Sequence, residues 1–195
     1  MGAEYTSPDR ETMEPRAARR RVVALAWPLI LSNITVPLLG LVDTAVVGHL
    51  PDSRYLGGVT LGATLFSFLF WGFGFLRMGT TGLTAQAQGR DDIDGVLRLL
   101  GQSLLLAVAI GLGLIVLHPL IVPLGLALLD GSAAVTAEAS VYAGIRILSA
   151  PAVLANYALI GWFLGRGNSR VTLLLMVTNN AVNIVLDLVF VVGLG

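Results

Sequence analysis

Cysteine is absent from this sequence of 195 residues, and histidine and charged residues are scarce. Without cysteine the chain has no disulfide, no thiolate metal site and no redox motif. The two histidines, His49 and His118, are too few for a histidine-rich metal site. Only 12% of the residues are charged, compared with about 25% in an ordinary soluble domain. This balance excludes a disordered chain and argues against a soluble globule.

An excess of basic charge is also missing. The 12 basic residues are all arginines, and 12 acidic residues balance them to a net charge of zero, so nothing indicates a nucleic-acid partner. The sequence has no phosphate-binding loop, no Gly-x-Ser-x-Gly elbow and no His-Glu-x-x-His zinc motif. We therefore expect neither an enzyme nor a chain with a cofactor or a resident metal.

Apolar residues are what the sequence has in abundance. They make up 55% of the chain, the mean hydropathy is +0.83, and the 23 glycines suit closely packed membrane helices. Because a bilayer core needs about 20 apolar residues per helix, the sequence predicts an all-α, polytopic transmembrane helical bundle. The predicted spans are residues 22–50, 55–88, 96–117, 138–164 and 171–195.

The segments outside the predicted spans are polar or contain helix breakers. Residues 1–21 have the composition of a disordered cytoplasmic tail. The third connection, residues 118–137, is the longest and contains Pro119 and Pro123. The chain stops within or just after an apolar run, so we expect a truncated product or a fragment.

Arginines mark one side of the predicted bundle. Five lie in the N-terminal tail, and pairs follow the second and fourth spans: Arg90 with Arg98, and Arg166 with Arg170. By the positive-inside rule these segments face the cytoplasm. We therefore expect an integral protein of the cytoplasmic (inner) membrane with its N-terminus inside. The apolar run after the tail is too long for a secretory signal peptide, and no cleavage site follows it.

Four polar residues lie where the bilayer makes them costly: Asp43, Asn156, Asn183 and Asp187. A charged side chain at the bilayer centre costs about 2.5 to 3.5 kcal/mol on insertion scales. For the two aspartates we favour a functional role, because an amide would hold helices together at a far smaller cost. For Asn183, helix packing and function are equally good interpretations. Asn179, Asn183 and Asp187 recur every four residues, so they share a helix face that must contact protein or a water-filled cavity.

Burial gives these aspartates a specific chemistry. Desolvation favours the neutral carboxylic acid over the carboxylate, and a second carboxylate nearby adds to the effect. Such a site can take up a proton, or it can bind a small cation through carboxylate and amide oxygens. Either event changes the local charge and so shifts a two-state arrangement of helices.

Three further features have simpler interpretations. Gly58 and Gly62 form a Gly-x-x-x-Gly pattern that predicts close packing of helices. Trp162 is expected near the inner interface, as in an aromatic belt. Arg146 lies inside the fourth predicted span, where it either pairs with a carboxylate or extends toward the interface.

Several segments carry a resemblance to a known family. They are WPLILSNITVPLLGLVDTAVVGHL at 27–50, GTTGLTAQAQG at 79–89, YAGIRILSAPAVLANYALIGWFLGRGNSR at 142–170 and NNAVNIVLDLVFVVGLG at 179–195. Together they resemble the N-terminal lobe of a multidrug and toxic compound extrusion (MATE) transporter of the DinF-like branch.

The resemblance implies a function and a complete fold. The function is multidrug efflux by an antiporter, which exports organic, often cationic drugs or metabolites in exchange for protons or sodium ions. The complete fold has 12 helices in two pseudo-symmetric lobes, and this chain supplies helices one to five of the first six-helix lobe. The sixth helix and the second lobe would belong to the same full-length chain or to a partner chain.

The resemblance also assigns residues to the coupling site. It makes Asp43 the cation-coupling aspartate of the first helix, and Asp187 and Asn183 the fifth-helix members of a hydrogen-bond network. Asn156 and Tyr142 belong to the same network on the fourth helix. If sodium is the coupling ion, Asp187, Asn156 and Tyr142 are the candidate ligands.

Pro28 matches a proline at which the first helix is proposed to bend when the site is protonated. One departure concerns the position one turn before the first-helix aspartate, where some relatives carry a tyrosine. This chain has Leu39 there, so we expect a smaller network around the aspartate.

Three other interpretations stay open. The nearest is a flippase for lipid-linked precursors from the same superfamily, although few basic residues lie inside the predicted spans to bind a pyrophosphate. The second is an inactive five-helix fragment. The third is an intramembrane aspartic protease with Asp43 and Asp187 as its dyad, but Asp187 lacks the Gly-x-Gly-Asp context typical of such enzymes.

Overall fold

The computed structural model describes residues 23, 26, 27, 30 and 53–187 of the chain. All regular secondary structure in this part is helical. The elements are α2 (Ser53–Gly72), α3 (Gly74–Gly89), α4 (Ile93–Leu128), α5 (Ala133–Arg146), the 3₁₀ turn η1 (Ile147–Ser149), α6 (Ala150–Gly165) and α7 (Ser169–Asp187).

Three helical stretches in the described part are long and apolar enough to cross a membrane. They are Arg54–Gly89, Ile93–Leu128 and Ala133–Gly165, with 36, 36 and 33 residues. Each exceeds the roughly 20 residues that a bilayer core requires. The prediction of an all-α membrane bundle is therefore confirmed. The first predicted span lies almost entirely outside the described residues, as does the C-terminal part of the fifth.

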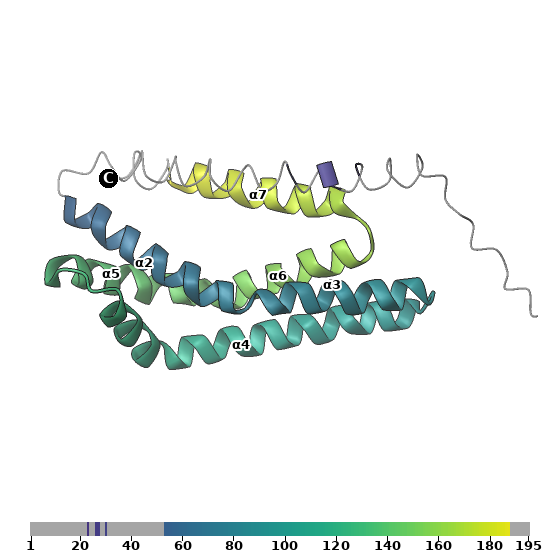
Figure 1. The fold of residues 1–195 in the computed structure, drawn as a ribbon, viewed down its shortest axis with the longest axis horizontal. Helices are drawn as coiled ribbons and strands as arrows, with labels where there is room; N and C mark the ends of the chain where they lie inside the picture. The colour runs from purple at the N-terminus through teal and green to yellow at the C-terminus, as the bar shows by residue number, and fades with distance from the viewer. Residues whose placement is uncertain (1–22, 24–25, 28–29, 31–52, 188–195) are drawn as a thin grey trace, which may run out of the picture.

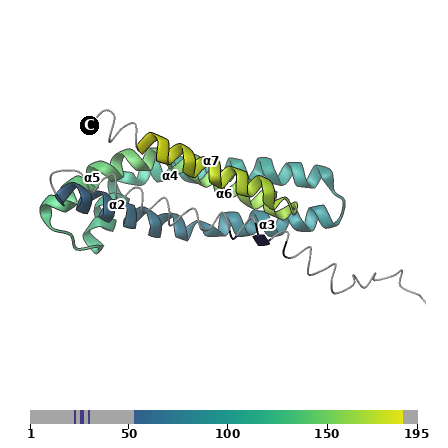
Figure 2. The same ribbon diagram turned by 90° about the horizontal axis from the view of Figure 1, so that it is seen from above.

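The long helices lie side by side (Figure 1). α2 packs on α5, and α3 packs on α6, while α4 contacts both α3 and α6. α7 follows a tight turn after α6 and runs back over it, which both views show (Figures 1 and 2). Side chains from α2 to α6, including the turn η1, form the main apolar core, in which Phe66, Ile147 and Leu154 are fully buried.

Two of the three stretches are interrupted near their middle. α2 ends at Gly72 and α3 begins at Gly74, with Phe73 in a turn between them. The two glycines have no neighbouring atoms where a Cβ would lie, so the break lies in open space. α5 and α6 are joined by η1, and Pro151 follows in the first turn of α6, where its missing N–H costs nothing.

The third connection was wrongly predicted. Residues 118–137 were expected to form a link, but α4 continues to Leu128 with Pro119 and Pro123 inside it, and α5 already begins at Ala133. A proline inside a helix removes the hydrogen bond to the carbonyl four residues earlier. At Pro119 that carbonyl belongs to Ile115, and Nδ1 of His118 lies 2.9 Å from its oxygen. The imidazole thus replaces the donor that the proline lacks.

Glycines set the close contacts between helices. Gly58 lies against Glu138 and Gly62 against the ring of Tyr142, which confirms the predicted close packing of the Gly-x-x-x-Gly pattern. A second such pattern, Gly161 with Gly165, packs on the backbone of α3. Added Cβ atoms at these glycines would lie 2.5 Å and 2.6 Å from backbone carbonyl oxygens of that helix.

Trp162 packs against protein. It is 6% exposed and contacts Ala87 and Val96, while its expected place near the inner interface stays a prediction. Its Nε1–H donates to the carbonyl oxygen of Val96 at 2.9 Å, and the guanidinium of Arg166 lies 4.6 Å from its ring centroid. The indole thereby joins α6 to the start of α4.

Candidate functional site

The structure distributes the predicted coupling residues over three helices. Tyr142 lies on α5, Asn156 lies half-buried on α6, and Asn183 and Asp187 lie on α7. The four-residue interval from Asn183 to Asp187 falls within continuous helix, so the two positions share a face, as predicted. Asp43 and Pro28 lie outside the described residues. The proposed pairing of the two aspartates therefore stays a prediction.

Tyr142 sits in the contact between α5 and α2. Its ring rests on Gly62, where any side chain on α2 would displace it. Its hydroxyl accepts a hydrogen bond from Nη1 of Arg146, one turn further along α5. The sequence did not predict this bond, although the spacing of four residues allowed it.

Arg146 is held by aromatic rings in addition to the tyrosine hydroxyl. Its guanidinium carbon lies 5.6 Å from the ring centroid of Phe66 and 5.6 Å from that of Tyr142, distances typical of cation–π contacts. Phe66 itself is 1% exposed, whereas Arg146 is exposed. No carboxylate of the described residues forms an ion pair with Arg146.

Polar residues follow one side of α5. Glu138, Tyr142 and Arg146 recur every four residues, and we call these three residues the polar stripe. Each contacts α2, at Gly58, Gly62 and Phe66 respectively. The neighbouring exposed side of α5 and η1 is apolar, with Val141, Ile145 and Leu148 exposed to 63%, 68% and 63%. The helix therefore presents two chemically different surfaces.

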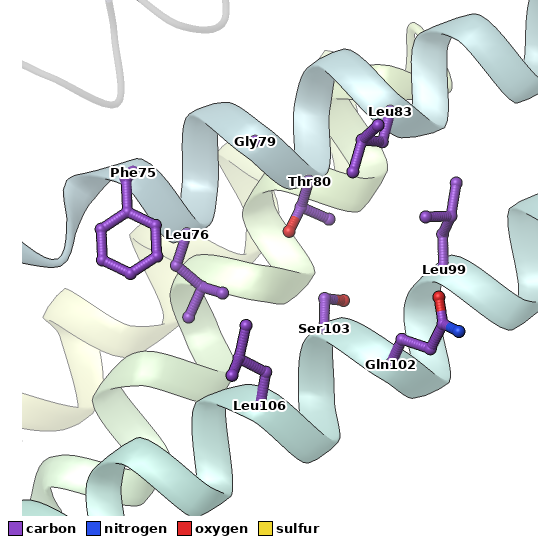
Figure 3. A pocket seen from close by; sticks show the side chains of 9 residues that line it. All are labelled: Phe75, Leu76, Gly79, Thr80, Leu83, Leu99, Gln102, Ser103 and Leu106. Carbon is purple, nitrogen blue, oxygen red and sulfur yellow. The ribbon is translucent and has the colours of Figure 1, made fainter.

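A second feature is a half-open cavity of about 200 Å³ between α3 and α4, which we call the apolar groove. Figure 3 shows the side chains of Thr80 and Ser103 directed into the space between the two helices. The hydroxyl of Ser103 donates to the carbonyl oxygen of Leu100 at 3.0 Å, so its hydrogen is already used. The lining residues are Phe75, Leu76, Gly79, Thr80, Leu83, Leu99, Gln102, Ser103 and Leu106.

The sequence did not identify the apolar groove. Its one signal was Gln102-Ser103, a polar pair inside an otherwise apolar span. The groove uses α3 and α4, whereas the polar stripe lies on α5 against α2. The two features thus belong to different helix pairs.

Metal ligands do not cluster in the described part of the chain. Among its residues, no three histidine, cysteine, aspartate or glutamate side chains lie together so that they could hold a metal ion. A sodium ion held by Asp187, Asn156 and Tyr142 would use carboxylate, amide and phenol oxygens, and this combination stays a prediction.

The comparisons with known proteins agree on one family. The MatE family model matches residues 28–189. The DNA damage-inducible protein F of Escherichia coli (strain K12) is 54% identical over 170 residues, which are 87% of this chain and 37% of that protein. A protein of Acinetobacter baylyi named "Probable multidrug resistance protein NorM" is 25% identical over 177 residues, 90% of this chain and 39% of its own length.

Solved structures show the same fold. The outward-facing conformation of a multidrug resistance MATE family transporter superposes with a TM-score of 0.80 at 25% identity, covering 90% of this chain and 39% of that one. The chain thus spans less than half the length of the relatives that it matches. Because the family model covers most of the chain and the E. coli relative is more than half identical, the chain belongs to the MatE family, whose members are membrane transporters and not enzymes.

Proposed function

We propose that this chain is part of a secondary antiporter that exports organic compounds in exchange for protons or sodium ions. The observation that carries the proposal is the family match over residues 28–189. That range includes all five proposed coupling residues, namely Asp43, Tyr142, Asn156, Asn183 and Asp187. The multidrug resistance proteins among the relatives support small organic molecules as the substrate class.

The activity belongs to a protein longer than this chain. The relatives are covered to only 37–40% of their length. A second set of helices, in the same full-length chain or in a partner chain, would complete the cavity. Substrate choice then depends on residues from both parts.

The coupling step follows from the cost of a charge in the membrane. Asp43 in its ionised form requires a compensating proton or cation, because desolvation penalises the bare carboxylate. Uptake of that ion would rearrange the network with Asp187, Asn183 and Asn156 and bend the first helix near Pro28. The substrate would then be expelled. The membrane potential supplies about 2.3 kcal/mol per charge per 100 mV for this cycle.

Replacement of the proposed coupling aspartate tests this function. We expect Asp43→Asn in the full-length protein to reduce gradient-driven efflux of ethidium by at least about a hundredfold, because an amide takes up neither a proton nor a charge-compensating sodium ion. Efflux is measured in proteoliposomes with imposed proton and sodium gradients.

The matched control is Asp130→Asn, which changes an exposed aspartate in the short connection between α4 and α5. It should leave efflux unchanged, and both variants should insert into the membrane like the wild type. Wild-type efflux from Asp43→Asn would refute the assignment of the coupling residue.

A further inference from the structure

Arg146 lies deep within a membrane-spanning stretch. It is the 14th residue of the 33-residue stretch Ala133–Gly165, which is about 50 Å long at 1.5 Å per residue. The hydrocarbon core of a bilayer is about 30 Å thick. Arg146 is about 20 Å from the Ala133 end by the same rise, so a bilayer centred on the stretch places it inside the core.

The two exposed surfaces of α5 cannot face the same environment. Val141, Ile145 and Leu148 suit lipid tails, which offer no hydrogen bonds. The guanidinium of Arg146 in the polar stripe does not suit lipid tails, because a charged group at this depth must face protein or water. On α5 the polar stripe packs against α2, and the exposed guanidinium of Arg146 at its end needs water or protein beside it. This end of the stripe would then border a water-filled cavity of the transporter, and the neighbouring apolar side would face lipid.

The hydrogen bond between Arg146 and Tyr142 has a defined direction. A guanidinium has five N–H donors and no acceptor, so the phenol oxygen accepts from Nη1. The O–H of Tyr142 is then free to donate to another group, and the remaining N–H groups of Arg146 are also donors. The pair presents a positive charge and several donors, which suits a carboxylate, sulfonate or phosphate.

The surroundings of this pair are apolar. Phe66 lies under the guanidinium, whose carbon is 5.6 Å from the ring centroid, a distance typical of a cation–π contact. Among the side chains that the structure describes, no carboxylate forms an ion pair with Arg146. A ligand that paired with Arg146 at this depth in the bilayer would combine an anionic group with a hydrophobic body.

We propose that Arg146 and Tyr142 bind the anionic group of an amphipathic organic anion, such as a long-chain carboxylate, and that the transporter carries this anion through its cavity. This inference rests on the proposed function and narrows its substrate class. It extends the expected class of organic cations, because a fixed cation at this position repels other cations and attracts anions.

Binding to the purified full-length protein tests the proposal without any ion gradient. The probes are 11-(dansylamino)undecanoic acid and its uncharged methyl ester, which share the same hydrophobic body. We expect Arg146→Gln to weaken binding of the acid by about tenfold to a hundredfold, as loss of hydrogen bonds to a charged group does. Binding of the ester should stay within twofold, and Arg146→Lys should retain part of the affinity for the acid.

Ile145→Ala is the matched control, because it changes the neighbouring residue on the lipid-facing side. It should leave the affinities for both probes unchanged. Equal binding of the acid by wild type and Arg146→Gln would overturn the proposal, and so would an equal loss of both probes in that variant.

The carboxylate of Asp43 in the same chain is the competing partner for Arg146. If the wild type does not bind the acid but Asp43→Asn does, Arg146 pairs with Asp43 and the proposal is wrong. Failure of the antiporter assignment has a different signature, namely unchanged ethidium efflux in Asp43→Asn. That result would leave Arg146-dependent binding of the acid intact.

Discussion

Single side chains donate hydrogen bonds to backbone carbonyls at a proline inside α4 and at the break between α5 and α6. At Pro119, His118 supplies a donor to the carbonyl oxygen of Ile115. At the 3₁₀ turn between α5 and α6, the hydroxyl of Ser149 donates to the carbonyl oxygen of Arg146 at 2.7 Å. A bilayer provides no water for such carbonyls, and each unsatisfied group is costly there. The imidazole and the hydroxyl therefore lower the cost of a proline inside α4 and of the 3₁₀ turn between α5 and α6.

A double substitution tests the role of His118. His118→Leu should lower stability by about 1 kcal/mol, the net value of one intramolecular hydrogen bond. In the Pro119→Ala background the restored N–H of residue 119 bonds to Ile115, so the same change should cost little. The melting temperatures of the four proteins in detergent measure this coupling. Equal losses from His118→Leu in both backgrounds would contradict the assigned role.

The sequence predicted local relations between residues better than contacts between distant helices. The interval from Asn183 to Asp187 is local and follows from helix periodicity, so it was predicted correctly. The contact of Arg146 with Phe66 joins residues on α5 and α2, and no local pattern indicates it. Trp162 donates its N–H to a carbonyl oxygen on α4, and no local pattern indicates this contact either. Burial of an indole depends on such a distant partner.

At the scale of helices, small residues decide which surfaces meet. In a membrane the helices do not gain hydrophobic energy by associating, so they associate by close backbone approach. Gly161 and Gly165 give α6 this approach to α3, and Gly111 gives α4 the same approach to Pro151 of α6. α2 uses Gly58 and Gly62 against α5 in the same way.

Adding one methyl group tests the contact between α3 and α6. Gly161→Ala should destabilise the fold by about 1 to 3 kcal/mol, because its Cβ would meet the carbonyl oxygen of Arg77. Gly82→Ala is the matched control, since open space surrounds that position on α3. It should be neutral or slightly stabilising, because alanine favours helix. Folded yield and melting temperature in detergent measure both effects. A neutral Gly161→Ala would show that the helices are further apart than described.

Helix boundaries were harder to predict than helices. The third predicted span ended at residue 117 because Pro119 and Pro123 are strong helix breakers. The chain nevertheless stays helical to Leu128, and the imidazole of His118 serves the carbonyl oxygen of Ile115 that Pro119 leaves without a donor. The second and fourth predicted spans each contain a local break in the α-helix, at Phe73 and at Ile147–Ser149.

At the scale of the molecule, polar and apolar features are separated. The polar stripe lies on α5 against α2, and the apolar groove lies between α3 and α4. A transporter needs both kinds of surface, because its cavity must hold water and polar groups while its outer face contacts lipid. In the part of the chain that the structure describes, the three long helical stretches present both polar and apolar surfaces.

Cysteine labelling tests the orientation proposed for the whole molecule. This chain has no cysteine, so single cysteines can be introduced at two exposed positions, Ser132 and Gln88. If the N-terminus is inside, a membrane-impermeant maleimide should label Ser132→Cys in intact cells. It should label Gln88→Cys only after the membrane is permeabilised. The reverse pattern would show that the arginine-rich segments face outward.

The sequence by itself determined the membrane class, the helical architecture and the family, because composition, hydrophobic run length and local motifs are properties of the chain alone. It also indicated the close packing at Gly58 and Gly62. Only the tertiary structure decided that Trp162 is buried, that Arg146 lies over Phe66, and that an apolar groove forms between α3 and α4. These features depend on which helix surfaces meet, and residues far apart in the sequence decide that.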